Sequence, residues 1–134
     1  MYGNIVNHDL HWIAGDSVNA VITYKVDGQV QDLTGCSVRM VVRQQEGESG
    51  VDVGDSLVAT YTSLENHFLI PVPADGKVYF NLASDITKTL NPENELKVQY
   101  VYSLQLVKPG DGTIVELVRT LLRGKLTIHS GVAR

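Results

Sequence analysis

The chain has 134 residues, a length that suits one domain with a hydrophobic core of its own. Its net charge is −4 and its eleven Lys and Arg residues are scattered, so we expect no nucleic-acid partner. No apolar run approaches the roughly 20 residues that span a bilayer, and residues 1–10 lack the pattern of a signal peptide, so we expect no membrane partner either.

Alternating apolar and polar side chains dominate the early part of the chain and predict β-strands. Residues 17–26 alternate in this way, and the Asp27-Gly28 pair that follows them predicts the tight turn of a hairpin. Residues 36–43 form a second alternating run, in which one face meets a core and the other meets water. The side chains of this run that we expect to face the core are Val38, Met40 and Val42.

The middle of the chain opens with a polar segment, residues 44–56, whose three glycines and four acidic residues predict a solvated loop. Residues 84–90 predict one or two turns of helix, with Ser84 as the capping residue. Between the loop and the helix, strand patterns occur at residues 57–63, 67–72 and 76–82.

The last part of the chain contains its longest alternating run, residues 95–107. A turn follows at residues 108–112, which include one proline and two glycines. Residues 113–130 then return as one strand that is kinked or bulged near Gly124, or as two shorter strands. The side chains of the first run that we expect to share the inward face are Leu96, Val98, Tyr100, Tyr102, Leu104 and Leu106.

Many short strands, close turns and a single helical segment predict an all-β fold, namely an antiparallel β-sandwich of the immunoglobulin-like type with one short helix. We expect residues 1–13 to form an N-terminal arm and residues 14–134 to form the single sandwich domain. Because the arm is too apolar to remain exposed to water, we expect it to bind a neighbouring subunit. The arm residues expected to bind this partner are Tyr2, Ile5, Leu10 and Trp12.

Few residues suggest catalysis or metal binding. The single cysteine, Cys36, precedes an apolar strand pattern, and we interpret it as a small buried hydrophobic residue. His8 and His11 have a spacing that two metal ligands can adopt, but no third ligand follows at a fixed offset. His67 and His129 lie in strand patterns as surface or boundary residues. We therefore expect neither a metal nor another cofactor.

The acidic segment 44–56 contains Asp52 and Asp55, for which two interpretations stay open. Their spacing does not match the EF-hand pattern, so solvated acids are favoured over a calcium site. The sequence contains no nucleophile elbow or phosphate-binding loop, and we predict that the protein is not an enzyme. Among the aromatic residues, Tyr2, Trp12 and Tyr61 are the candidates for stacking on a sugar or on a partner protein.

Short motifs follow one another along the chain in a characteristic order. They are Gly15-Asp16, Asp32-Leu33-Thr34-Gly35, Arg43, Tyr102-Ser103-Leu104-Gln105-Leu106, Leu121-Leu122-Arg123-Gly124 and the ending Val132-Ala133-Arg134. With this order and spacing, the chain from about Trp12 onward resembles a family of tailed-bacteriophage virion proteins. The group that it resembles is the N-terminal domain of the phage baseplate upper protein, with related head-fibre and tail-fibre domains. Ser103 stands where the family has Asp, and Ala133 where it has Thr.

This resemblance implies a structural protein without catalytic chemistry. It implies a virion component, made in the host cytoplasm, that assembles with other virion proteins and forms a homo-oligomer. The roles that fit are capsid decoration or cement, the base of a fibre, or a baseplate connector. The alternative is a carbohydrate-binding module that attaches the virion to a host glycan.

Overall fold

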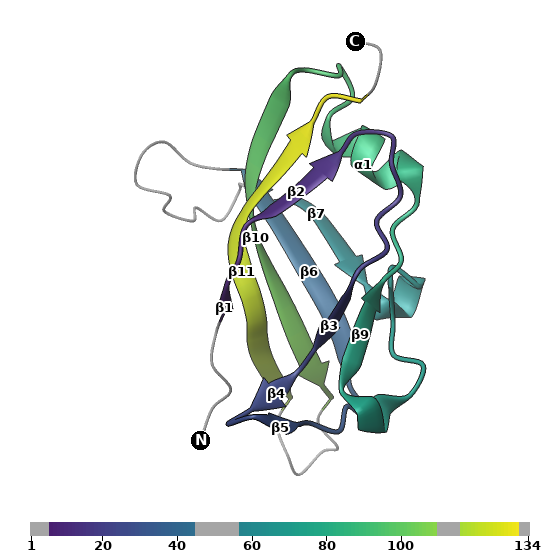
Figure 1. Ribbon diagram of the computed structural model, residues 1–134, viewed down its shortest axis with the longest axis vertical. Helices are drawn as coiled ribbons and strands as arrows, with labels where there is room; N and C mark the ends of the chain where they lie inside the picture. The colour runs from purple at the N-terminus through teal and green to yellow at the C-terminus, as the bar shows by residue number, and fades with distance from the viewer. Residues whose placement is uncertain (1–5, 45–56, 110–115, 132–134) are drawn as a thin grey trace.

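The computed structural model describes residues 6–44, 57–109 and 116–131 of the chain. The largest β-sheet forms one side of the molecule (Figure 1). This sheet has six strands in the order β1-β11-β10-β6-β7, with β2 also paired to β11. The strands span Val6–Asn7 (β1), Leu10–Ile13 (β2), Ser37–Gln44 (β6), Leu57–Thr62 (β7), Lys97–Lys108 (β10) and Leu117–His129 (β11).

A smaller sheet, in the order β3-β9-β8, lies opposite the larger one, and a separate hairpin joins β4 to β5 (Figure 1). Asp27 and Gly28 form the turn of this hairpin, both with positive φ, as their sequence predicts. The remaining elements span Val21–Thr23 (β3), Lys25–Val26 (β4), Gln29–Val30 (β5), Ser63–Glu65 (η2), Phe68–Leu69 (β8), Pro73–Asp75 (η3), Lys77–Phe80 (β9) and Ser84–Leu90 (α1).

The two sheets enclose one hydrophobic core, and the inward face of β6 is the predicted one. Its three apolar side chains are each 0% exposed, and they pair across the sheet with inward residues of β10. The smaller sheet closes the core from the other side, where the rings of Phe68 and Phe80 meet edge to face at a centroid distance of 5.1 Å. The buried residues of β6 are Val38, Met40 and Val42.

The hairpin of β10 and β11 contains the irregularity that the sequence predicts. Pairing passes from Leu104–Leu122 to Gln105–Thr120, so Leu121 is an extra residue in β11 and forms a bulge. The strand continues unbroken past this point, so the segment is one strand and not two. The prediction that Leu96 faces the core is wrong. This residue precedes β10 and is 70% exposed.

Helix α1 has the bounds that the sequence predicts, but a different residue begins it. The N-cap is Ala83, which makes no side-chain hydrogen bond, so the capping role expected of Ser84 is not observed. The helix is held instead by the buried Thr87, whose hydroxyl donates to the carbonyl of Asp16 at 2.7 Å and accepts from the N–H of Gly15 at 3.0 Å. These contacts place α1 over one end of the core (Figure 1).

The N-terminal segment 6–13 is part of the larger sheet. Both β1 and β2 run parallel to β11, from which they are separated by more than a hundred residues of sequence. Trp12 points from β2 into the core and is only 7% exposed. The described part of the expected arm, residues 6–13, therefore pairs with the last strand of the chain.

Close backbone contact joins this segment to β11 at Gly124. A Cβ atom at Gly124 would lie 2.5 Å from the carbonyl oxygen of His8 and 2.9 Å from Oδ1 of Asp9, so a larger residue does not fit. The N–H of His8 donates to the carbonyl of Arg123 at 2.8 Å, and Asp9 Oδ1 accepts from the N–H of Lys125 at 3.0 Å. The glycine is needed here for close approach of two backbones.

Tyr102 completes this contact from the neighbouring strand. It pairs with Gly124 across β10 and β11, where the glycine leaves room beside the ring. Its hydroxyl donates to the carbonyl of His8, and the side chain is only 4% exposed. Gly124 and Tyr102 together accommodate the N-terminal segment on β11.

The fold class is confirmed as mainly β with one α-helix and several antiparallel sheets. Two features differ from the expected sandwich. The N-terminal strands are parallel to their neighbour, and the strand order is not clearly that of an immunoglobulin-like domain. β1 and β2 occupy the edge of β11 that β10 leaves free, and both run parallel to it.

Substitution Gly124→Ala tests the close contact with residues 6–13. A glycine-to-alanine change inside a strand ordinarily stabilises a protein slightly. Here we expect a loss of about 1–3 kcal/mol in the free energy of unfolding, because the added methyl group displaces the His8 carbonyl. Urea unfolding measures the change, and Lys125→Ala in the same strand is the control, expected to stay within about 0.5 kcal/mol of wild type. A stabilised Gly124→Ala variant would contradict the contact.

Candidate functional site

The residues predicted to bind a partner do not form one surface in the described chain. Trp12 fills the core of its own chain, and Leu10 is half-buried against the same core. Tyr2 and Ile5 lie outside the described residues. A binding role for these four residues stays a prediction, and for Trp12 the observed position is an intrachain one.

Histidines that are distant in sequence meet in the structure. Nδ1 of His11 and Nε2 of His129 are 3.1 Å apart, and their rings stack with centroids 5.3 Å apart. The sequence associates His11 with His8, but the contacts of His8 to β11 and Tyr102 are made by its backbone. His67 packs edge-on against Tyr61, and its Nδ1 is buried without a hydrogen-bond partner in the described structure.

The other candidates for chemistry are constrained by their surroundings. Cys36 is half-buried beside the core, and burial raises the pKa of its thiol, which disfavours the reactive thiolate. Asp52 and Asp55 lie outside the described residues, so the structure does not describe the acidic segment. In the described ranges, no three His, Cys, Asp or Glu side chains gather in a way that could hold a metal ion. Within these ranges no helix is long and apolar enough to cross a membrane.

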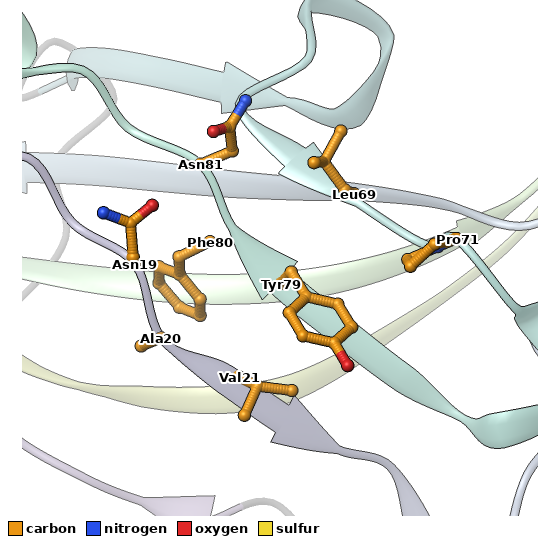
Figure 2. A pocket seen from close by; sticks show the side chains of 8 residues that line it. All are labelled: Asn19, Ala20, Val21, Leu69, Pro71, Tyr79, Phe80 and Asn81. Carbon is orange, nitrogen blue, oxygen red and sulfur yellow. The ribbon is translucent and has the colours of Figure 1, made fainter.

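An open groove runs over the outer face of the smaller sheet (Figure 2). It has a volume of about 440 Å³ and lies between β3, β9 and the segment after β8. Tyr79 is 38% exposed and Val21 50% exposed, and together with Pro71 they make the lining largely apolar. The amides of Asn19 and Asn81 lie together at one end of the groove (Figure 2).

Tyr79 and Phe80 are consecutive residues of β9. Successive residues of a strand point to opposite faces of a sheet, so two neighbouring aromatic residues cannot both face the core. The structure buries Phe80, which is 4% exposed, and leaves Tyr79 in the groove. Conversely Tyr61, a predicted candidate for stacking on a sugar, is only 8% exposed in the core.

The outer face of the larger sheet gathers basic side chains. We call this surface the basic face and define it by Arg39 and Arg43 of β6 and Arg123 and Lys125 of β11. These side chains occupy three successive cross-strand rows on the side of the sheet away from the core. The rows are Arg43–Val101–Lys125, Val41–Ser103–Arg123 and Arg39–Gln105–Thr120.

Hydrogen-bonding groups accompany the charges of the basic face. Nε of Arg39 donates to Oε1 of Gln105 at 3.0 Å, and Nε of Arg123 donates to Oδ1 of Asn7 at 3.1 Å. A shallow hollow of about 510 Å³ opens between β6, β7 and β10, where it is lined by both arginines of β6, Thr60 and Ser103. Guanidinium groups and hydroxyls in such a hollow suit carboxylate groups of a partner.

The sequence alone indicates no such face, because its basic residues are scattered. The spacing does carry a signal, since Arg39 and Arg43 have the same parity within one strand, as do Arg123 and Lys125 within another. Whether these two pairs of basic residues share one surface depends on which strands are neighbours in the sheet. Because β10 alone separates β6 from β11, the four charges share one surface.

The fold defined above is a two-layered β domain with a parallel N-terminal edge. No protein-family model matches the chain, and no curated protein matches its sequence. Among solved structures, its fold is similar to the N-terminal domain of phage TP901-1 ORF48, with a TM-score of 0.54 and 9% sequence identity. The similarity covers 97% of this chain and 100% of that one. This confirms, as a likeness of fold, the resemblance to a phage protein domain that the motifs predict.

Two buried tyrosines lead us to expect a fall in stability at alkaline pH. Burial raises the pKa of both Tyr61 and Tyr102 to about 12. An unfolded chain ionises its tyrosines near pH 10, so between about pH 10 and 12 it releases protons that the native state retains. The stabilisation that these two tyrosines provide is therefore fully present below about pH 10 and is lost as the pH rises from there through about 12.

Substitution Tyr102→Phe separates two effects of this hydroxyl on stability, namely its hydrogen bond to the His8 carbonyl and its ionisation at alkaline pH. At pH 7 we expect a loss of about 1 kcal/mol, because the His8 carbonyl loses its donor. Above pH 10 we expect a shallower fall of stability than in wild type, since one ionising group is gone. Urea unfolding from pH 7 to 11 measures both effects, and Tyr79→Phe controls for loss of an exposed hydroxyl at pH 7. Parallel curves for wild type and Tyr102→Phe would contradict the assignment.

Proposed function

We propose that this chain is a non-enzymatic structural component of a tailed-phage virion and that it acts in protein–protein assembly. The observation that carries this proposal is the likeness of fold to the N-terminal domain of a phage protein, which spans nearly the whole of both chains. The motifs from Gly15-Asp16 to Gly124 support the same proposal from the sequence. The expected location is the virion, and the roles that fit are capsid decoration, fibre base or baseplate connector.

The basic face is the assembly surface that we propose. Four cationic side chains gathered on one face of the sheet favour an acidic protein surface as partner. The remainder of this chain is itself acidic, because the net charge is −4 although the face contributes four positive charges. Other virion proteins, or acidic parts of another copy of this chain, are therefore partners of the expected chemistry.

The absence of enzymatic activity belongs to the same proposal. Support comes from three side chains that could act as nucleophiles or acids. Burial raises the pKa of the Cys36 thiol and of the Tyr61 and Tyr102 hydroxyls. In each case burial favours the protonated and less reactive form. A nucleophile in an active site is ordinarily activated in the opposite direction.

A second candidate function, attachment to a host glycan, has one specific observation in its favour. The groove of Figure 2 combines the exposed ring of Tyr79 with two amides, and sugars are bound by such rings and hydrogen-bonding groups together. The amide nitrogen of Asn81 already donates to the carbonyl of Asn66 at 2.8 Å, and that of Asn19 donates to Ser17 Oγ at 3.3 Å. These contacts leave fewer amide donors for a sugar, and the groove is therefore the second candidate.

Incorporation into phage particles tests the first proposal. Quantitative immunoblots of purified particles should detect the wild-type chain when it is expressed in cells that produce the phage. The double variant Arg39→Glu/Lys125→Glu should be depleted by about tenfold, because each change reverses a charge on the basic face. The matched control Lys77→Glu/Lys88→Glu changes net charge equally on exposed sites of β9 and α1 and should be incorporated like wild type.

Two outcomes of this experiment are adverse. Absence of the wild-type chain from particles would contradict the virion assignment. Equal incorporation of both double variants would retain the virion assignment and reject the basic face as its assembly surface.

Removal of residues 1–5 tests the predicted role of Tyr2 and Ile5 in oligomer formation. This deletion spares β2 and Trp12, so every core residue that the structure describes is retained. Light scattering of the full chain should give a homo-oligomeric mass, and the shortened chain should give a smaller one. The variant Trp12→Ala serves as a comparison, which should lose about 3–5 kcal/mol of stability through the core. An unchanged oligomeric mass after removal of residues 1–5 would contradict the role of the two side chains.

A further inference from the structure

The pair formed by His11 and His129 lies where the N-terminal segment meets the last strand. His11 belongs to β2 and pairs with Thr127 across the two parallel strands, and His129 follows two positions later in β11. Both side chains stand on the outer face, because the intervening Trp12 and Ile128 are buried in the core. Two strands that are distant in sequence but paired in the sheet thus place two imidazoles diagonally next to each other.

The geometry of the pair matches that of two ligands on one metal ion. Nδ1 of His11 and Nε2 of His129 are 3.1 Å apart. Zinc lies about 2.0–2.1 Å from an imidazole nitrogen, so two ligands at angles of roughly 90–110° are separated by about 2.9–3.4 Å. The observed separation lies within this range without any change in the strands.

We propose that His11 and His129 bind a divalent transition-metal ion, of which Zn²⁺ and Ni²⁺ are suitable examples, and that this ion fastens β2 to β11. Imidazole nitrogen is a ligand that suits both metals. In the hydrogen bond between the rings one nitrogen must donate a proton to the other. A metal ion takes the place of that proton, which moves through solvent to the other nitrogen of the same ring, and the ion accepts a lone pair from each facing nitrogen.

The site has two ligands from this chain and leaves further coordination positions for water. His11 is exposed and His129 half-buried, so an ion has access and the rings can turn toward it. Lys97 lies opposite His129 on β10 and is the cation that most directly opposes binding. The inference is independent of the virion assignment, because it rests only on the contact between β2 and β11.

Metal binding at this position stabilises the docking of the N-terminal segment. An ion that binds the folded chain and not the unfolded one raises the midpoint of thermal unfolding. The ion joins two strands that already pair through a parallel backbone ladder and are supported by the contacts around Gly124 and by Trp12. Amide exchange in β2 should therefore slow on addition of metal, which is a readout of this strand in particular.

Titration calorimetry of the tag-free full chain with ZnCl₂ and with NiCl₂ tests the proposal. Wild type should bind one ion per chain at this site, with a rise in the thermal midpoint and slower amide exchange at Trp12. His11→Ala and His129→Ala should each weaken binding by about tenfold or more, since each removes half of the protein ligands. The matched control His8→Ala removes an exposed histidine of the same segment and should bind like wild type.

Each remaining outcome decides against the proposal. No measurable binding by wild type would overturn it, as would equal binding by wild type and both pair variants. Circular dichroism verifies that the variants fold, and His11→Gln and His129→Asn replace any alanine variant that does not. Metal binding that survives in the pair variants but disappears on removal of residues 1–5 would place the ion elsewhere and reject this pair.

Discussion

The close packing of the N-terminal segment across Gly124 is the contact on which the edge of the larger sheet depends. At this point the His8 carbonyl lies too close for a Cβ atom to fit. The ring of Tyr102 fills the space beside the glycine, and its hydroxyl donates to the same carbonyl. Trp12 then enters the core four residues further along. One small residue in β11 thus permits the backbone contact, and one buried aromatic residue on either side of it supplies apolar area.

The two faces of this sheet have different physical roles. Alternation along β6, β10 and β11 directs aliphatic and aromatic side chains into the core and leaves the opposite face to polar groups. On that outer face the four cations of the basic face come together, although the chain as a whole is acidic. Net charge therefore describes solubility, whereas the distribution of charge over a surface determines which partners it attracts.

The candidate sites were only partly predictable, because each one combines residues from distant strands. The sequence draws attention to His11 but associates it with His8, its neighbour in sequence, whereas the structure joins it to His129. Tyr79 and Phe80 are neighbours in the sequence, yet strand geometry sends them to opposite faces of the sheet. The sequence thus identified candidate residues but not the residues that lie beside them in space, because the spacing of residues within one strand does not say which strand pairs with it.

The sequence by itself determined the local structure. The Asp27-Gly28 turn, the inward face of β6 and the bounds of α1 follow from short-range backbone preferences and from alternation over a few residues. Only the tertiary structure decided that residues 6–13 form parallel strands on β11. That pairing joins segments separated by more than a hundred residues, and it depends on space at Gly124 and on burial of Trp12. Local patterns record which way a side chain points, and they do not record which strand lies beside it.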